Sequence, residues 1–144
     1  MNTRKTFQNE KVNVKIILAA LWTAVMFIYV YADIKTLFQP EIPEQIISGI
    51  VGGMTISQSF LFAAAVLMSV PPIMILLSLI LKPGINRVVN IVVSSLHIIL
   101  IIITRFVPGK IWYYYIYYQS IEAIFHFLII WFAWKWPVQE KTIE

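Results

Sequence analysis

Residues 112–136 read WYYYIYYQSIEAIFHFLIIWFAWKW, and this stretch decides the fold. It is long enough to cross the hydrocarbon core of a bilayer, which takes about 20 residues of α-helix. Trp112 stands at one end and Trp134 with Trp136 at the other, as aromatic side chains do at membrane interfaces. We therefore expect a transmembrane helix over about 112–135.

The composition of the rest of the chain agrees with a membrane protein. The chain has 144 residues, of which 60% are hydrophobic and only 12% are charged, whereas about 25% of a soluble domain is charged. It contains no cysteine, which excludes disulfides, thiolate metal sites and cysteine nucleophiles. The basic residues stand singly beside apolar runs instead of forming a stripe, so we expect no nucleic-acid partner.

Three further apolar runs have the length of a transmembrane helix. They cover about 14–32, 56–81 and 85–104, and the first is longer than the apolar core of a signal peptide, which has about 7 to 15 residues. The sequence thus predicts one membrane domain over 1–144, all-α in class, folded as a four-helix transmembrane bundle with antiparallel neighbours.

Proline marks two special places in this plan. Pro71 and Pro72 lie in the middle of the second span and should kink it, because proline removes backbone donors. Between the first two spans, Pro43 and Glu44 suit the start of a short helix. Apolar residues follow at helical spacing, so we expect a short amphipathic segment over about 43–51 at the membrane interface, with an apolar loop as the alternative.

The distribution of lysine and arginine gives an orientation. Cytoplasmic loops of membrane proteins carry an excess of these residues. Eight lie at the two termini and in the second connection, and three lie in the first and third connections. Both termini are therefore predicted to be cytoplasmic. The eight are Arg4, Lys5, Lys11, Lys15, Lys82, Arg87, Lys135 and Lys141, and the three are Lys35, Arg105 and Lys110.

Glu122, near the middle of the fourth span, is the most unusual residue in the chain. An acidic side chain at the centre of a transmembrane helix costs about 3 kcal/mol, while each Leu, Ile or Phe returns about 0.3 to 0.6 kcal/mol. The many apolar neighbours make insertion feasible, yet something must compensate the acid. His126 lies one helical turn away, on the same face.

Polar or small side chains form a stripe on three of the predicted helices. Lipid cannot satisfy polar groups, so these faces should turn toward one another. The stripe of the fourth span is Tyr115, Gln119, Glu122 and His126; that of the third is Asn86, Asn90, Ser94 and His97; and a weaker one on the second is Thr55, Gln58, Phe62, Ala65 and Ser69.

The depth of these residues predicts a site. His97 and Glu122 each lie ten residues from a membrane boundary, which is about 15 Å at 1.5 Å per residue, so His97, Glu122 and His126 should meet near the midplane. We expect an outward-opening pocket with these residues as its floor, lined by Gln119 and Tyr115. Its outer rim would hold three further residues, of which the first two could form an ion pair: Asp33, Arg105 and Gln58.

Structural explanations compete with this site. Asn, Ser and Thr on inward faces most often bond to a neighbouring helix, and Asp33 and Arg105 suit a membrane boundary. A buried hydrogen bond between Glu122 and His126 would stabilise the helices without any activity. One Glu and His pair at this spacing falls short of a metal ligand set, so we expect neither a metal nor a cofactor.

Much of the chain resembles an uncharacterised family of small bacterial membrane proteins with four helices. The resemblance rests on YADIKTLFQP at 31–40, IVGGMTISQSFLFAAAVLM at 50–68, PPIMILLSLILK at 71–82, NRVVNIVVSS at 86–95 and YYYIYYQSIEAIFHFLIIWFAWKW at 113–136. A looser likeness to DoxX-like membrane proteins concerns helix number and size. The resemblance implies a multi-pass protein of the bacterial inner membrane and carries over no catalytic residue.

Three functions remain open at this point. The first is binding or transport of a small ligand, ion or proton, with Glu122 and His97 or His126 handling its charge. The second is an enzyme acting on a lipid-soluble substrate, although no catalytic motif supports it. The third is a structural or assembly subunit, since small residues such as Ala20, Ala24 and Ala64 allow close helix approach. The lipid bilayer is the one partner that follows directly; ligand identity and homo-oligomerisation stay open.

Overall fold

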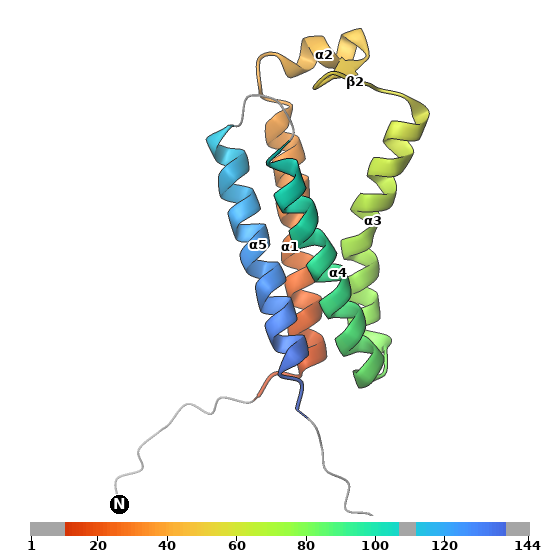
Figure 1. Ribbon diagram of the computed structural model, residues 1–144, viewed down its shortest axis with the longest axis vertical. Helices are drawn as coiled ribbons and strands as arrows, with labels where there is room; N and C mark the ends of the chain where they lie inside the picture. Colours follow the sequence, from red (N-terminus) through yellow and green to blue (C-terminus); the bar gives the residue numbers. More distant parts are fainter. Residues whose placement is uncertain (1–10, 107–111, 138–144) are drawn as a thin grey trace, which may run out of the picture.

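The computed structural model describes residues 11–106 and 112–137, and in these ranges it is helical apart from one short hairpin (Figure 1). Its elements in chain order are α1 (Val14–Thr36), α2 (Ile42–Ser48), β1 (Ile50–Val51), β2 (Met54–Thr55), α3 (Gln58–Ile80), α4 (Pro83–Thr104) and α5 (Tyr113–Trp134).

Four of these helices, α1, α3, α4 and α5, are long and apolar enough to cross a membrane. This confirms the prediction of four candidate transmembrane helices and indicates a multi-pass membrane protein. The first span continues beyond its expected end at 32 to Thr36, and α3 runs without a break through Pro71 and Pro72. Four of the basic residues used to orient the chain, Arg4, Lys5, Lys110 and Lys141, lie outside the described residues.

Local sequence explains where the helices begin. The side chain of Asn13 accepts a hydrogen bond from the backbone N–H of Lys15, and that of Ser57 accepts one from Phe60. Each of these two side chains accepts from a backbone N–H that has no partner within the first turn of its helix. Pro83 stands at the first position of α4, where the missing N–H costs nothing and the fixed φ already suits a helix.

The four long helices lie side by side, with α1 packed against both α3 and α5, and α5 packed also against α4 (Figure 1). Although α3 and α4 are joined by a tight turn, they make far less contact with each other. The upper part of α3 in Figure 1 leans away from the other helices. We call the end that carries β1 and β2 the hairpin end, and the opposite end the terminal end, because both described chain ends lie there.

The connection over the hairpin end folds as α2 followed by the antiparallel pair β1 and β2. Pro43 lies in the first turn of α2 beside Glu44, as expected from the sequence. Gly52 and Gly53 form the turn between the strands with φ of 56° and 79°, a region that glycine enters without steric cost. The placement of this segment at a membrane surface remains a prediction.

Burial in these helices is the reverse of that in a soluble protein. Large apolar side chains face outward on every long helix, such as Phe27, Leu76, Val88 and Phe127, each more than half exposed. A contiguous apolar surface of this kind needs a cover, and lipid supplies it. The interior holds apolar and polar residues alike; the buried polar ones are Ser78, Asn86, Asn90, Ser94, His97, Gln119, Glu122 and His126.

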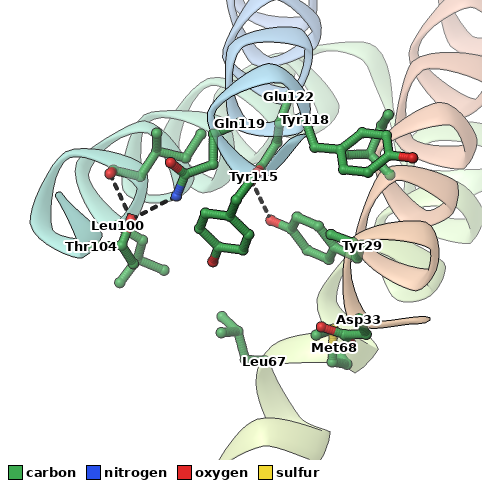
Figure 2. Close-up of a pocket in the computed structure, with 13 residues that line it drawn as sticks. Tyr29, Asp33, Leu67, Met68, Leu100, Thr104, Tyr115, Tyr118, Gln119 and Glu122 are labelled. Atoms are coloured by element: carbon green, nitrogen blue, oxygen red, sulfur yellow. Dashed lines mark hydrogen bonds between the residues drawn. The ribbon is translucent and has the colours of Figure 1, made fainter. Parts of the chain in front are cut away.

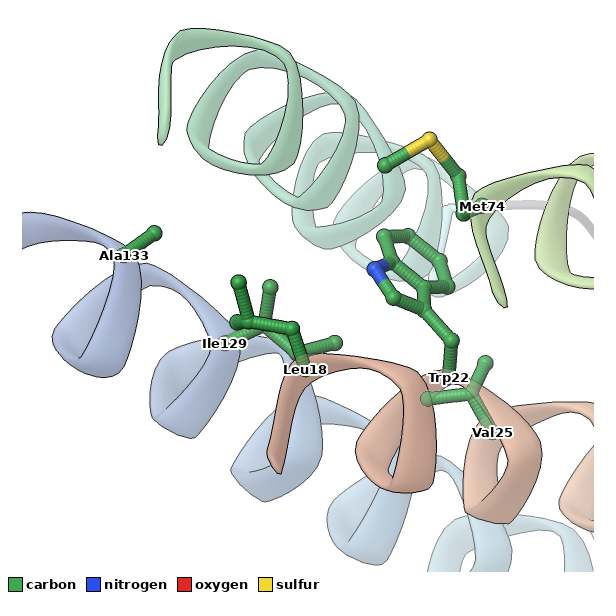
Figure 3. Close-up of a cluster of buried hydrophobic side chains, with 6 residues drawn as sticks. All are labelled: Leu18, Trp22, Val25, Met74, Ile129 and Ala133. Carbon is green, nitrogen blue, oxygen red and sulfur yellow. The ribbon is translucent and has the colours of Figure 1, made fainter. Parts of the chain in front are cut away.

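Trp22 of α1 occupies the centre of the packed helices. It is fully buried and belongs to an apolar cluster with Leu18, Val25, Met74 and two residues of α5, Ile129 and Ala133 (Figure 3). Its indole Nε1–H donates to the side-chain oxygen of Asn90 on α4 at 2.7 Å. This bond joins two helices that share little direct contact, so the indole ring spans the middle of the group.

Asn90 in turn organises the polar contacts between α3 and α4. Its Oδ1 also accepts a bond of 3.3 Å from Ser78 on α3, and its amide donates to the side chain of Asn86 at 2.6 Å. The Asn86 amide donates to the backbone oxygen of Ser78 at 2.6 Å. Asn86 and Asn90 were expected to bond to neighbouring helices, and the structure confirms it. The same expectation is wrong for Ser69, which bonds to Val66 of its own helix, and for Ser94, whose hydroxyl has no partner among the described residues.

The expectation of an inward polar stripe on the second span is wrong for its outer half. Phe62 is 70% exposed, and Gln58 and Ala65 are exposed as well. Only the half nearer the terminal end buries residues of this helix, namely Pro71, Met74 and Ser78. The physical reason is the lean of α3, which separates its outer half from α4 and α5.

The bond between Trp22 and Asn90 should be measurable by a double-mutant cycle with Trp22→Phe and Asn90→Leu. We expect a coupling energy of about 1 kcal/mol in the free energy of unfolding in detergent. This is above the average measured for hydrogen bonds between transmembrane helices. The matched control pairs Asn90→Leu with Trp134→Phe, since Trp134 is 66% exposed, and should show no coupling. If the coupling energy for Trp22 and Asn90 equalled that of the control pair, the hydrogen bond would contribute nothing to the stability of the fold.

Candidate functional site

Four aromatic rings meet at mid-depth between α1, α4 and α5. The imidazoles of His97 and His126 lie 5.0 Å apart between ring centroids. Trp22 contacts both edge-on, at 5.7 and 5.4 Å, and Tyr29 stacks on His97 at 6.4 Å. The histidines predicted to approach each other from different helices therefore do so, with two aromatic residues of α1 holding them.

Glu122 lies directly beside this pair. Its Oε1 accepts a hydrogen bond of 2.8 Å from the hydroxyl of Tyr29 and lies 3.6 Å from Nε2 of His126. The Glu122 side chain is 10% exposed and that of His126 is fully buried. The distance to His126 exceeds that of an ordinary hydrogen bond, so in this arrangement Tyr29 is the partner that holds the carboxyl group.

A cavity of about 150 Å³ opens on the other side of Glu122, toward the hairpin end. Figure 2 shows Tyr29 and Tyr115 extending into it, with Asp33 and Leu67 across from Tyr115. Side chains from α1, α3, α4 and α5 line it. A dry cavity of this volume accepts a molecule the size of benzene, so the space suits a small ligand.

The orientation of the Gln119 side chain follows from its neighbour Thr104. The Thr104 hydroxyl donates to the backbone oxygen of Ile101 at 2.7 Å, so its oxygen is available to accept. It accepts a bond of 2.9 Å from Nε2 of Gln119 (Figure 2). The amide oxygen of Gln119 is buried and has no partner among residues 11–106 and 112–137, although the residue lines the cavity.

Several buried polar atoms at this depth have no hydrogen-bond partner in the described ranges. They are Oγ of Ser94, Nε2 of His97, Oε1 of Gln119, and both ring nitrogens of His126. Buried polar groups in proteins are nearly always paired, and leaving one unpaired costs about 1–3 kcal/mol. Three of these five atoms belong to Gln119 and His126, which lie one helical turn on either side of Glu122 on α5, whereas the side-chain amides of Asn86 and Asn90 are bonded.

The structure brings most of the predicted site residues together. His97, Gln119, Glu122 and His126 are buried at the helix contacts, and Tyr115 and Asp33 line the cavity. The histidines lie behind Glu122, away from the cavity, so Glu122 rather than a histidine faces it.

The predicted outer rim is only partly assembled. Gln58 and Arg105 do not line the cavity, because α3 leans away and Arg105 follows the last residue of α4. The proposed ion pair between Asp33 and Arg105 is absent among residues 11–106 and 112–137.

Tyr29 is the important residue that the sequence analysis missed. Its signal was present: Trp22, Tyr29, Asp33 and Thr36 recur at helical steps along one face of α1. The hydroxyl of Thr36 approaches that of Tyr114 on α5 at 3.0 Å, so two residues of this stripe, Tyr29 and Thr36, contact α5. Aromatic residues within a transmembrane span usually serve helix packing, so the sequence offered no reason to assign a role to the hydroxyl group of Tyr29.

No group of three His, Asp or Glu side chains in the described part of the chain is placed to hold a metal ion. The chemistry available here is that of a carboxyl group, a phenol and two imidazoles. Together these can accept, hold and pass on a proton, and the carboxyl group can compensate a positive charge.

A comparison with protein families matches residues 4–143 to the model of a family of unknown function, DUF6326. The chain belongs to the DUF6326 family. This confirms the resemblance to an uncharacterised family, while a link from DUF6326 to DoxX-like proteins is not shown. No curated protein and no solved structure matches the chain.

Access to the cavity of this DUF6326 member can be probed with cysteine, since the natural sequence has none. Ala32→Cys places a thiol in the lining, and Ala133→Cys places one at a fully buried position. We expect a small thiosulfonate reagent to modify the first at least about tenfold faster, because thiol reactivity requires access. Equal rates for the two variants would show that the cavity is closed to solutes.

Proposed function

We propose that the protein binds, and carries across the membrane, a small ligand whose uptake is linked to a proton at Glu122. In this proposal it lies in the bacterial inner membrane as a single-domain, antiparallel four-helix bundle. Both termini are cytoplasmic, as the distribution of lysine and arginine predicts, so the cavity opens outward. The proposal assigns no catalytic step.

The single observation that carries this proposal is the position of Glu122 between two environments. On one side the residue lines the cavity. On the other its carboxyl group contacts Tyr29 and His126, and His126 lies against His97. A ligand that enters the cavity therefore acts on the same carboxyl group that exchanges a proton with the histidines, and this links the two events.

The unpaired atoms around Glu122 argue against a purely structural role. A polar cluster that serves only to fix helix register stabilises best when every group is bonded, as around Asn90. Both nitrogens of His126 are instead unbonded at a fully buried position. Such a cost is expected where function needs groups that change partners.

Polar groups also continue from the site toward the terminal end. His97, Ser94, Asn90 and Asn86 lie on one face of α4 at steps of three and four residues, and all are buried. This column extends over about 16 Å at 1.5 Å per residue. It supports the transport part of the proposal, because it places buried polar groups between the site and the terminal end.

Infrared difference spectroscopy tests the role of Glu122. We expect the reconstituted protein to show a reversible carboxyl titration that Glu122→Gln removes. Glu44→Gln changes the same chemical group in the exposed turn of α2 and should leave that signal intact. Spectra of wild type and Glu122→Gln that agree over the whole titration would refute proton exchange at this residue.

His126→Phe separates the functional from the structural explanation. Phenylalanine keeps an aromatic ring against Trp22 and removes two unbonded nitrogens, so we expect the free energy of unfolding to stay within about 1 kcal/mol of wild type, while the proton exchange slows. If Glu122 and His126 instead formed a stabilising buried pair, the variant would lose about 3–5 kcal/mol. Thermal unfolding in detergent, measured beside the infrared titration, decides between them.

A further inference from the structure

We propose that the cavity selects small monovalent organic cations, such as primary amines about the size of benzene. This inference names the ligand class of the site described above and rests on the proposed function. Four features of the cavity support it: its charge, its hydrogen-bonding groups, its aromatic rings and its size.

The charge of the lining has one sign. Among the described residues, two carboxyl groups, those of Asp33 and Glu122, belong to it, and no Lys, Arg or His does. Asp33 forms no ion pair in the described part of the chain, and it stands one helical turn beyond Tyr29, about 6 Å along α1. A cation could thus be compensated first at the exposed Asp33 and then at the buried Glu122.

The hydrogen-bonding groups of the lining favour a ligand that donates. Gln119 is 6% exposed, and its amide nitrogen donates to Thr104. Its amide oxygen lacks a partner in the part of the chain that the structure describes. Glu122 still has the oxygen that Tyr29 does not use. An ammonium group carries several N–H donors and no acceptor, so it could satisfy both residues at once.

Three tyrosine rings distinguish an organic cation from a hydrated ion. Tyr29, Tyr115 and Tyr118 line the cavity beside aliphatic residues such as Leu67 and Leu100. Cations are attracted to the faces of such rings, and the aliphatic residues suit an apolar body. A bare metal ion would need several oxygen ligands at fixed distances, and no metal cluster forms in the described ranges.

The test compares three ligands of nearly equal shape and different charge: benzylammonium, benzyl alcohol and benzoate. Binding is measured by calorimetry on the protein in lipid nanodiscs, with empty nanodiscs subtracted. We expect benzylammonium to bind at least about tenfold tighter than benzyl alcohol, a difference of about 1.4 kcal/mol, and benzoate not to bind. Bound benzylammonium should also slow the reaction of the Ala32→Cys thiol with the thiosulfonate reagent.

Variants assign the selectivity to the two carboxyl groups. Asp33→Asn and Glu122→Gln should each lower the affinity for benzylammonium by about tenfold. The affinity for benzyl alcohol should be nearly unchanged, since only the cation loses its counter-charge. Glu44→Gln makes the same change of charge on α2 and should alter neither ligand. Far-ultraviolet circular dichroism and thermal unfolding verify that each variant is folded.

Three results would overturn this inference. They are equal affinities for benzylammonium and benzyl alcohol, no binding of benzylammonium, and displacement of benzylammonium by sodium at equal concentration, which would indicate an inorganic cation site. The infrared titration of Glu122 needs no ligand. A normal titration with any of these results would therefore reject the ligand class alone, whereas a missing titration rejects the proposed function.

Discussion

The hydrogen bond between the indole of Trp22 and the side chain of Asn90 is the contact on which the rest of the structure depends. It is 2.7 Å long and fully buried, and it joins α1 to α4 across the middle of the four helices. Lipid offers no alternative partner for either group. The same indole ring supports His97 and His126 edge-on. The side chain of Trp22 thus joins two helices and also supports the two imidazoles of the candidate site.

The interior divides into two parts with different physical character. Around Asn90, every side-chain amide group has a partner, either on a neighbouring helix or one turn away on α4, and the contacts between helices join α4 to α1 and α3. One to two turns farther along α4, around His97, buried atoms are left unpaired next to a carboxyl group and a cavity. The bonded part supplies the rigidity that holds the unbonded part in place, as functional sites require of their surroundings.

The sequence predicted the helices and two of the polar faces because both follow from periodicity. Spacing of three and four residues placed His97, Glu122 and His126 on inward faces, and counting residues along each helix placed them at one depth. Periodicity gives no information on how far a helix leans, so the exposed outer half of α3 and the absence of Gln58 from the cavity could not be foreseen. It also gives no partner: the bond from Tyr29 to Glu122 depends on which helices are neighbours, and that order is set by packing.

The weak contact between α3 and α4 has a consequence for biosynthesis. These helices follow each other directly in the chain, yet the main packing surface of α4 is α5, which is synthesised later. Until α5 enters the membrane, His97 lacks its neighbour on that helix, and the polar face of α4 lies partly open to lipid. The unfinished chain is therefore less stable in the bilayer than the finished one. Assembly of the four long helices is tied in this way to completion of α5.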